Sequence, residues 1–246
     1  MFVKTILTSL VFTLFLCADN KSMEHVGVEV TTQSPNKVKK QYIVKRNIPK
    51  ACKDVPSTND MFWTGNFAND AVPEICKSTY VHTKGKLLSI KLDVDLETFG
   101  ELEVLRFLKE MQEDKNLLLI DSRLEKWYKY RTIPGAINIP FVYFRDKESY
   151  EFHFEYALKY LGVGTEEDGA YDFEKAKTLV IFCNGPWCSQ SPSMIFALLR
   201  IGYPTEKLKW YRGGMQDWLG AGMTSTREVD FKTLAKDALN KEHPKK

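Results

Sequence analysis

Two cysteines lie five residues apart in a segment whose residue types could perform thiol chemistry, TLVIFCNGPWCSQSPSMIFALL. The apolar run over residues 178–182 predicts a buried strand, and Cys183 follows it directly. Turn-forming residues come next, and we expect a helix to begin near Ser189. Open α/β sheets bind ligands where a strand ends and a helix begins, because backbone N–H groups converge there.

Cys183 therefore stands where a nucleophile belongs. A helix N-terminus lowers the pKa of a nearby thiol, so we expect Cys183 to ionise readily. The alternative is an inert buried cysteine, since this residue is a common small core residue. The loop expected to surround an anion at this sulfur consists of Asn184, Gly185, Pro186, Trp187 and Ser189.

Cys188 is a candidate resolving cysteine for Cys183. A disulfide requires the two Cα atoms to lie within about 7 Å of each other. The five-residue spacing across a loop permits this contact and does not ensure it. Whether the two cysteines form a disulfide stays open at this point.

The surrounding sequence predicts the elements that position this loop. Strand patterns alternate with helix patterns, which predicts an α/β domain with a mostly parallel sheet flanked by helices. The expected strands cover residues 88–92, 117–120, 178–182 and 208–211, with a short extended piece at 135–140. The expected helices cover residues 102–111, 153–161, 191–201 and 215–219.

Three segments in this order resemble the rhodanese (sulfurtransferase) family. They are LLLIDSRLEKWYKYRTIPGAINIPF, the cysteine loop and LKWYRGGMQDW. The matching residues outside the loop are Asp121, Arg123, Tyr128, Ile133, Gly135, Ala136, Asn138, Ile139, Pro140, Gly213, Gly214 and Trp218. The resemblance implies a rhodanese-like fold over residues 88–228, a persulfide on Cys183, a supporting role for Asp121 and Arg123, and no cofactor.

The sequence departs from the family pattern at two places. Thr132 stands where the family usually has histidine, and Cys188 takes the sixth loop position, where it often has a cation. The nearest other cations are Lys126, Lys129 and Arg131. Thiosulfate is a dianion, so the resemblance disfavours its efficient turnover here. Phosphatase chemistry is also disfavoured, since no arginine occurs in residues 183–193.

The leading expectation is a sulfurtransferase that takes sulfur from polysulfide or thiosulfate and passes it from Cys183 to a thiol acceptor. A thiol–disulfide oxidoreductase that uses Cys183 and Cys188 is the second hypothesis. The third is a binding module that keeps the fold without catalysis.

Charge and histidine spacing exclude other classes. The chain has 35 Lys and Arg against 32 Asp and Glu, a net charge of +3, so we expect no nucleic-acid partner. The histidines are His25, His82, His153 and His243, and none lies at ligand spacing from a cysteine, so no metal site is expected.

The N-terminus resembles a secretory leader. Lys4 precedes an apolar run over residues 5–17 that is shorter than the about 20 residues needed to span a bilayer. We expect cleavage after residue 18 and a periplasmic protein; a lipid anchor on Cys17 is the alternative membrane attachment.

In an oxidising compartment Cys52 and Cys76 are expected to form a disulfide. We expect residues 19–87 to form an N-terminal extension that is partly flexible and docked on the domain, and residues 229–246 to form a basic tail.

Overall fold

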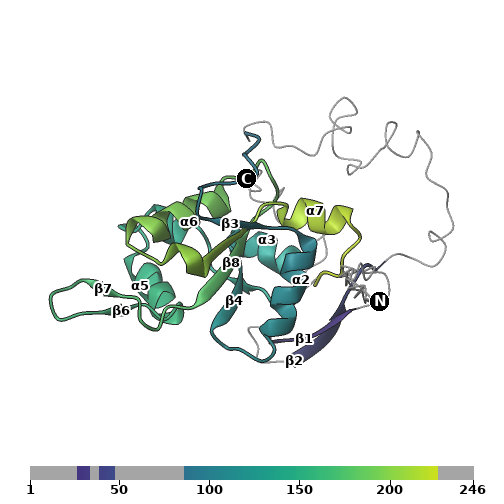
Figure 1. Cartoon of the computed structure of the whole chain (residues 1–246), viewed down its shortest axis with the longest axis horizontal. Helices are drawn as coiled ribbons and strands as arrows, with labels where there is room; N and C mark the ends of the chain where they lie inside the picture. Colours follow the sequence, from purple (N-terminus) through teal and green to yellow (C-terminus); the bar gives the residue numbers. More distant parts are fainter. Residues whose placement is uncertain (1–26, 34–38, 48–85, 227–246) are drawn as a thin grey trace, which may run out of the picture.

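The computed structural model describes residues 27–33, 39–47 and 86–226 (Figure 1). The leader over residues 1–18, the Cys52–Cys76 pair and the tail over residues 229–246 lie outside the described residues. These expectations therefore stay predictions.

The centre of the fold is a five-stranded sheet. Its order is β3 (Glu97–Phe99), β9 (Leu208–Tyr211), β8 (Thr178–Phe182), β4 (Leu117–Asp121) and β5 (Ile137–Asn138). All four pairings of this sheet are parallel. The central strands β4 and β8 are buried on both faces, which explains their continuous apolar sequences.

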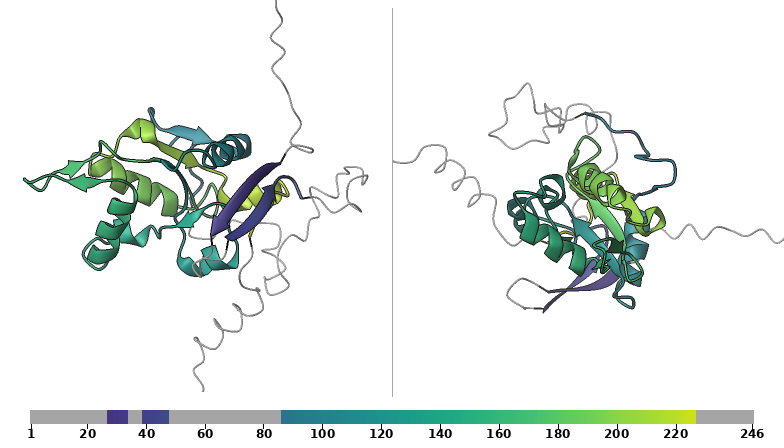
Figure 2. Two further views of the ribbon diagram at one scale, coloured as in Figure 1. Left: turned by 90° about the horizontal axis from the view of Figure 1, so that it is seen from below. Right: turned by 90° about the vertical axis from the view of Figure 1, so that its left-hand side faces the viewer.

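Alternate residues of these strands belong to two separate cores. On one face, Ile120 and Ile181 pack in a cluster with buried residues of α4 (Val142–Arg145), α5 (Glu151–Tyr160) and α6 (Gln190–Arg200). On the other, Leu119 and Val180 pack with α2 (Glu101–Glu110) and α7 (Gly214–Gly220). The predicted fold class, a mostly parallel sheet flanked by helices, is confirmed (Figures 1 and 2).

A β-hairpin of the N-terminal extension packs on the second core. Strands β1 (Val28–Gln33) and β2 (Lys39–Val44) pair antiparallel, and Val30 and Val44 are buried in that core (Figure 2). The amide of Asn47 donates to the carbonyl of Gly222 at 2.6 Å. The sequence analysis missed this hairpin, because its polar outer residues hide two buried valines.

The remaining described elements are short. A second hairpin consists of β6 (Gly164–Thr165) and β7 (Tyr171–Asp172). Helix α3 (Glu125–Tyr130) follows β4, and a 3-10 turn, η3 (Thr205–Lys207), precedes β9. No helix within the described ranges is long and apolar enough to cross a membrane.

The strand expected over residues 88–92 is wrong. These residues form bends without strand pairing, and the sheet begins at Glu97. Leu88 and Leu92 do face the first core, but Ile90 between them is 67% exposed. Instead, the amide of Leu88 donates to the carbonyl of Pro186 at 2.9 Å, and Arg212 Nη2 donates to the carbonyl of Leu88 at 2.8 Å. The segment is thereby attached to the cysteine loop.

Candidate active site

The cysteine loop connects the C-terminal end of β8 to α6. Cys183 directly follows β8, and Ser189 is the N-cap of α6. Both sulfur-bearing residues are buried, with 2% of Cys183 and 5% of Cys188 exposed. The loop therefore holds two thiols at the edge of the sheet where parallel strands place ligand sites.

The glycine pair at the start of α7 fixes the loop backbone. The amide of Met215 donates to the carbonyl of Cys183 at 3.0 Å, and that of Gln216 to the carbonyl of Asn184 at 2.8 Å. Gly214 has φ +55°, and a Cβ atom there would lie 2.4 Å from the Cys183 carbonyl oxygen. Only glycine fits this close approach, which explains the second glycine of the Gly-Gly motif.

A buried ion pair supports the loop from β4. The Arg123 guanidinium donates to both carboxylate oxygens of Asp121, at 2.7 Å for Nη2 to Oδ2, and the two side chains are 3% and 0% exposed. Thr132 Oγ1 also donates to Asp121, at 2.8 Å. The hydroxyl at the place of the family's histidine thus binds the carboxylate. Arg123 Nη1 lies 3.4 Å from Asn184 Oδ1 of the loop.

This ion pair leaves the loop without a free cation from Arg123, because the Asp121 carboxylate neutralises it. Among the cations named from the sequence, Lys129 Nζ pairs with Glu125 at 2.6 Å, and Lys126 Nζ lies 5.9 Å from the Trp127 ring centroid. The Arg131 guanidinium lies 6.0 Å from the Tyr130 ring centroid. These contacts direct the three side chains to partners on α3 and its ends.

The sulfur of Cys183 lies in a chain of hydrogen bonds. Ser191 Oγ donates to Cys183 Sγ at 3.1 Å, and Trp210 Nε1 donates to Ser191 Oγ at 3.1 Å. Cys183 Sγ donates to the carbonyl of Cys188 at 3.4 Å. Burial raises the pKa of Cys183 well above its ordinary value, and a hydrogen bond with the Cys188 thiol raises it further. The bonds from Ser191 act in the opposite direction.

Cys188 is the sulfur that ionises more readily. Its pKa is lowered to about 6, chiefly because it accepts a hydrogen bond from the Cys183 thiol. The backbone amides of Asn184 and Gln190 and the Asn184 side chain, whose Nδ2 lies 3.6 Å from Cys188 Sγ, also stabilise the thiolate. The expectation of a lowered pKa at Cys183 is thus reversed: the pKa of Cys183 is raised and that of Cys188 is lowered.

The other loop residues hold the loop in place. The amide of Cys188 donates to the carbonyl of Gly185 at 2.9 Å, so it does not face an anion. Pro186 has no N–H to offer and instead accepts the bond from Leu88. Trp187 Nε1 donates to Gln216 Oε1 on α7, which fixes the indole at the rim. Of the predicted cradle, only Asn184 binds a sulfur; the other groups that do so, Gln190 and Ser191, lie in the first turn of α6.

Sequence reasoning missed Ser191 and Trp210. A hydroxyl in the first turn of the helix after a cysteine loop was a usable signal for Ser191. Trp210 had no comparable signal, because its bond to Ser191 depends on how α6 packs against β9.

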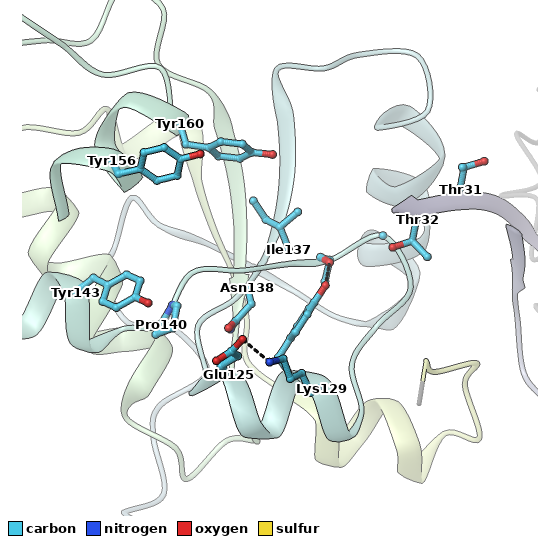
Figure 3. Close-up of a pocket in the computed structure, with 13 residues that line it drawn as sticks. Thr31, Thr32, Glu125, Lys129, Ile137, Asn138, Pro140, Tyr143, Tyr156 and Tyr160 are labelled. Carbon is cyan, nitrogen blue, oxygen red and sulfur yellow. Dashed lines mark hydrogen bonds and ion pairs between the residues drawn. The ribbon is translucent and has the colours of Figure 1, made fainter. Parts of the chain in front are cut away.

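Two hollows lie away from the loop, beside the edge strand β5. They have volumes of about 860 Å³ and 330 Å³ and share Tyr143, Tyr156 and Tyr160. Figure 3 shows the larger of the two. Neither is lined by a residue of the cysteine loop. The thiol chemistry and these hollows are therefore separate features. Within the described ranges, no group of three or more His, Cys, Asp or Glu side chains is placed to hold a metal ion.

Comparisons with solved structures give low similarity. A protein, BH2092, from Bacillus halodurans is 18% identical, covers 58% of this chain and 90% of its own, and has a TM-score of 0.39. A rhodanese with anions from E. coli is 22% identical over 45% of this chain and 98% of its own, with a TM-score of 0.29. A thiosulfate sulfurtransferase from Pseudomonas aeruginosa is 17% identical over 57% of this chain and 22% of its own, with a TM-score of 0.34.

No curated protein matches the chain at a significant level. The family model described as Rhodanese-like domain matches residues 105–221. This range contains the Asp121–Arg123 pair, the cysteine loop and the glycine pair, which are the three segments that carried the resemblance. Residues 105–221 of the chain are therefore a rhodanese-like domain.

Proposed function

We propose that the protein is a sulfurtransferase that carries a sulfane sulfur as a persulfide on Cys183. The observation that supports this most directly is the position of Cys183, which is buried at the end of β8. Its sulfur accepts a hydrogen bond from the Ser191 hydroxyl at 3.1 Å. A thiolate at this place is stabilised without a cation, by one hydroxyl and one backbone amide of Ser191.

The neighbouring thiol supplies the base. The pKa of Cys188 is lowered, chiefly by the Cys183 thiol, so the Cys188 sulfur can take the Cys183 proton once that proton turns toward it from the Cys188 carbonyl oxygen. The Cys183 thiolate then attacks the terminal sulfur of a donor, forms a new S–S bond and displaces the donor's remaining part with the electron pair of the broken bond. A thiol acceptor later attacks the outer sulfur and returns Cys183 to the thiolate.

The charge of the loop favours weakly charged donors. The Cys183–Cys188 pair carries one negative charge at neutral pH, and the nearby Arg123 is neutralised by Asp121. An organic persulfide in its R–S–SH form is uncharged and a hydropolysulfide carries a single charge, so both suit this site better than thiosulfate, which is a dianion.

The test is intact mass and turnover of Cys183→Ser. We expect the wild type, incubated with an organic persulfide, to transfer sulfur to cyanide or a thiol, and Cys183→Ser to lose at least about nine-tenths of this activity with an unchanged circular dichroism spectrum. Full activity in Cys183→Ser would refute the proposal and would direct attention to Cys188.

The contact between the two thiols favours one second function, thiol–disulfide exchange. In that case the wild type would exchange with small disulfides without any sulfane sulfur donor, and Cys188→Ser would be as inactive as Cys183→Ser. Sulfur transfer by Cys188→Ser would decide against this alternative.

We also propose that the chain acts in the periplasm, on the basis of the apolar leader over residues 5–17. The mass of the mature chain purified from the envelope fraction tests this. A mature N-terminus near residue 19 supports export, a lipid-modified Cys17 supports the anchored form, and an intact chain in the cytoplasm refutes both.

A further inference from the structure

Cys188 is a buried residue of the cysteine loop that contacts Cys183. It occupies the sixth loop position, is 5% exposed, and its carbonyl oxygen accepts a hydrogen bond from Cys183 Sγ at 3.4 Å. Asn184 binds its sulfur through Nδ2. Both cysteines are therefore buried in one loop and joined by the bond between the Cys183 sulfur and the Cys188 carbonyl oxygen.

We propose that Cys188 is a second catalytic cysteine, which attacks the Cys183 persulfide and releases hydrosulfide, leaving a Cys183–Cys188 disulfide. This inference rests on the proposed function, because it begins from the persulfide. It adds a further activity, the reductive release of sulfane sulfur as sulfide.

The step balances without an external oxidant. After sulfur uptake Cys183 carries S–SH, once the proton held by Cys188 has moved to the outer sulfur. The Cys188 thiolate attacks Cys183 Sγ, a new S–S bond joins the two cysteines, and the bond between Cys183 Sγ and the outer sulfur breaks. The outer sulfur leaves as HS⁻ with that electron pair, so the sulfane sulfur is reduced while the two cysteine sulfurs end as a disulfide.

The contacts explain why Cys188 would attack the inner sulfur. In the resting state the Cys188 carbonyl oxygen contacts Cys183 Sγ at 3.4 Å, and Cys183 Sγ is the inner sulfur of the persulfide. Attack on the inner sulfur also has hydrosulfide as the leaving group, which stays ionised near neutral pH and leaves readily.

A thiol reductant completes the cycle. Two equivalents of a low-molecular-weight thiol, or one dithiol, reduce the Cys183–Cys188 disulfide and restore the thiol–thiolate pair. The net reaction consumes one sulfane sulfur and two thiols and yields hydrosulfide and one disulfide. The partner that this chemistry requires is therefore a thiol reductant.

The experiment uses the full chain without oxygen, reduced and then freed of reductant, with one equivalent of glutathione persulfide. Trypsin releases residues 178–200 as one peptide, because Lys177 and Arg200 flank a segment without lysine or arginine. This peptide contains Cys183 and Cys188 but not Cys52 or Cys76. Its mass therefore reports on this pair alone, and free sulfide is measured in the same sample.

For the wild type we expect this peptide about 2 Da lighter than its reduced form, with about one sulfide released per chain. Cys188→Ser should keep the persulfide, about 32 Da heavier than its reduced form, and release sulfide only at the rate of glutathione persulfide alone. Cys188→Ala repeats this result without a hydroxyl. Near-ultraviolet circular dichroism verifies that both variants are folded.

Each result separates the inference from the function on which it rests. A wild-type peptide that keeps the added sulfur, with Cys188 still open to alkylation, would overturn the inference and leave the sulfurtransferase proposal standing. Equal sulfide release by wild type and Cys188→Ser would do the same. The absence of both the heavier peptide in Cys188→Ser and the lighter one in wild type would overturn both.

Discussion

The hydroxyl of Ser191 donates a hydrogen bond to the sulfur of Cys183 across 3.1 Å. Trp210 sets the direction of that bond, because its indole N–H can only donate and binds the same Ser191 oxygen at 3.1 Å. The single proton of Ser191 is then available for the sulfur. Helix α6 thus supplies a side-chain donor to the candidate nucleophile in addition to its N-terminal backbone.

Replacing Ser191 with alanine is predicted to slow sulfur uptake by Cys183. A hydrogen bond to a charged group contributes about 1.5–3 kcal/mol, so the rate of persulfide formation should fall about 10- to 100-fold. The rate constant is measured under single-turnover conditions with an organic persulfide donor. Removal of the bond also raises the pKa of Cys183, since Ser191 lowers it, so the loss should be partly recovered at higher pH.

Ser193→Ala is the matched control, because this serine lies in the same helix and is only half-buried. It should keep the wild-type rate. Trp210→Phe should give an intermediate loss, since it frees the hydroxyl without removing it. A wild-type rate in Ser191→Ala would show that the bond has no role in the reaction.

Gly214→Ala is predicted to displace the cysteine loop. The added Cβ would lie 2.4 Å from the Cys183 carbonyl oxygen and 2.8 Å from the Gly185 nitrogen. Both are backbone atoms, which cannot move aside as the end of a flexible side chain can. Its φ of +55° adds strain for a residue with a side chain. We expect a loss of about 1–3 kcal/mol in unfolding free energy and most of the activity.

Gly220→Ala tests the same substitution in the same helix. A Cβ there meets no atom within 4 Å, so its stability should equal or slightly exceed that of the wild type. Denaturant unfolding of both variants gives the comparison. Equal stability of the two would show that the loop accommodates the methyl group.

The sequence predicted correctly those elements whose position follows from a run of buried apolar residues and from the residue that comes next in the chain. The strand over residues 178–182 and the position of Cys183 after it were predicted, because continuous apolar runs are typical of strands buried on both faces. Residues 208–211 were also predicted correctly as a strand. The segment 88–92 alternated like a strand, but the backbone groups of Leu88 bond to Pro186 and Arg212 and not to the open edge of β3.

The properties of the two sulfurs could not be predicted from the sequence. Helix position alone indicated a lowered pKa for Cys183, whereas burial and the contact with Cys188 decide it. Which cysteine donates and which accepts depends on loop geometry. The Ser191–Trp210 bond depends likewise on the packing of α6 against β9.

Thiolate absorbance in the ultraviolet is predicted to appear on raising the pH through about 6, well below the ordinary range of a thiol. Because the pKa of Cys188 is lowered, the pair is fully protonated below this value and holds one proton above it. Cys188→Ser should lose this transition. In Cys183→Ala the donor that chiefly lowers the Cys188 pKa is gone, so the midpoint should move upward.

Alkylation of the 178–200 peptide gives an independent readout of the same titration. The thiolate is the reactive form, so Cys188 should be modified faster than Cys183 above pH 6. Preferential modification of Cys183, or no transition below pH 8, would contradict the assignment of the charge to Cys188.

The last prediction concerns thiosulfate. The sixth loop position carries a cysteine with a lowered pKa in place of a cation, so it offers a dianion no positive charge and opposes it when ionised. Cys188→Arg replaces that charge with a guanidinium whose bonds to an anion contribute about 1.5–3 kcal/mol each. We expect kcat/KM for thiosulfate to rise about 10- to 100-fold, while the wild type prefers polysulfide.

Cys188→Met is the control, because it removes the thiolate and adds length without positive charge; it should give a smaller gain. Since Cys188 is buried, thermal unfolding of both variants must show that the longer side chains are tolerated. If the wild type turned over thiosulfate as well as Cys188→Arg, then Lys126, Lys129 or Arg131 would have to reach the donor from α3 and its C-terminal end, despite the contacts that now direct them elsewhere.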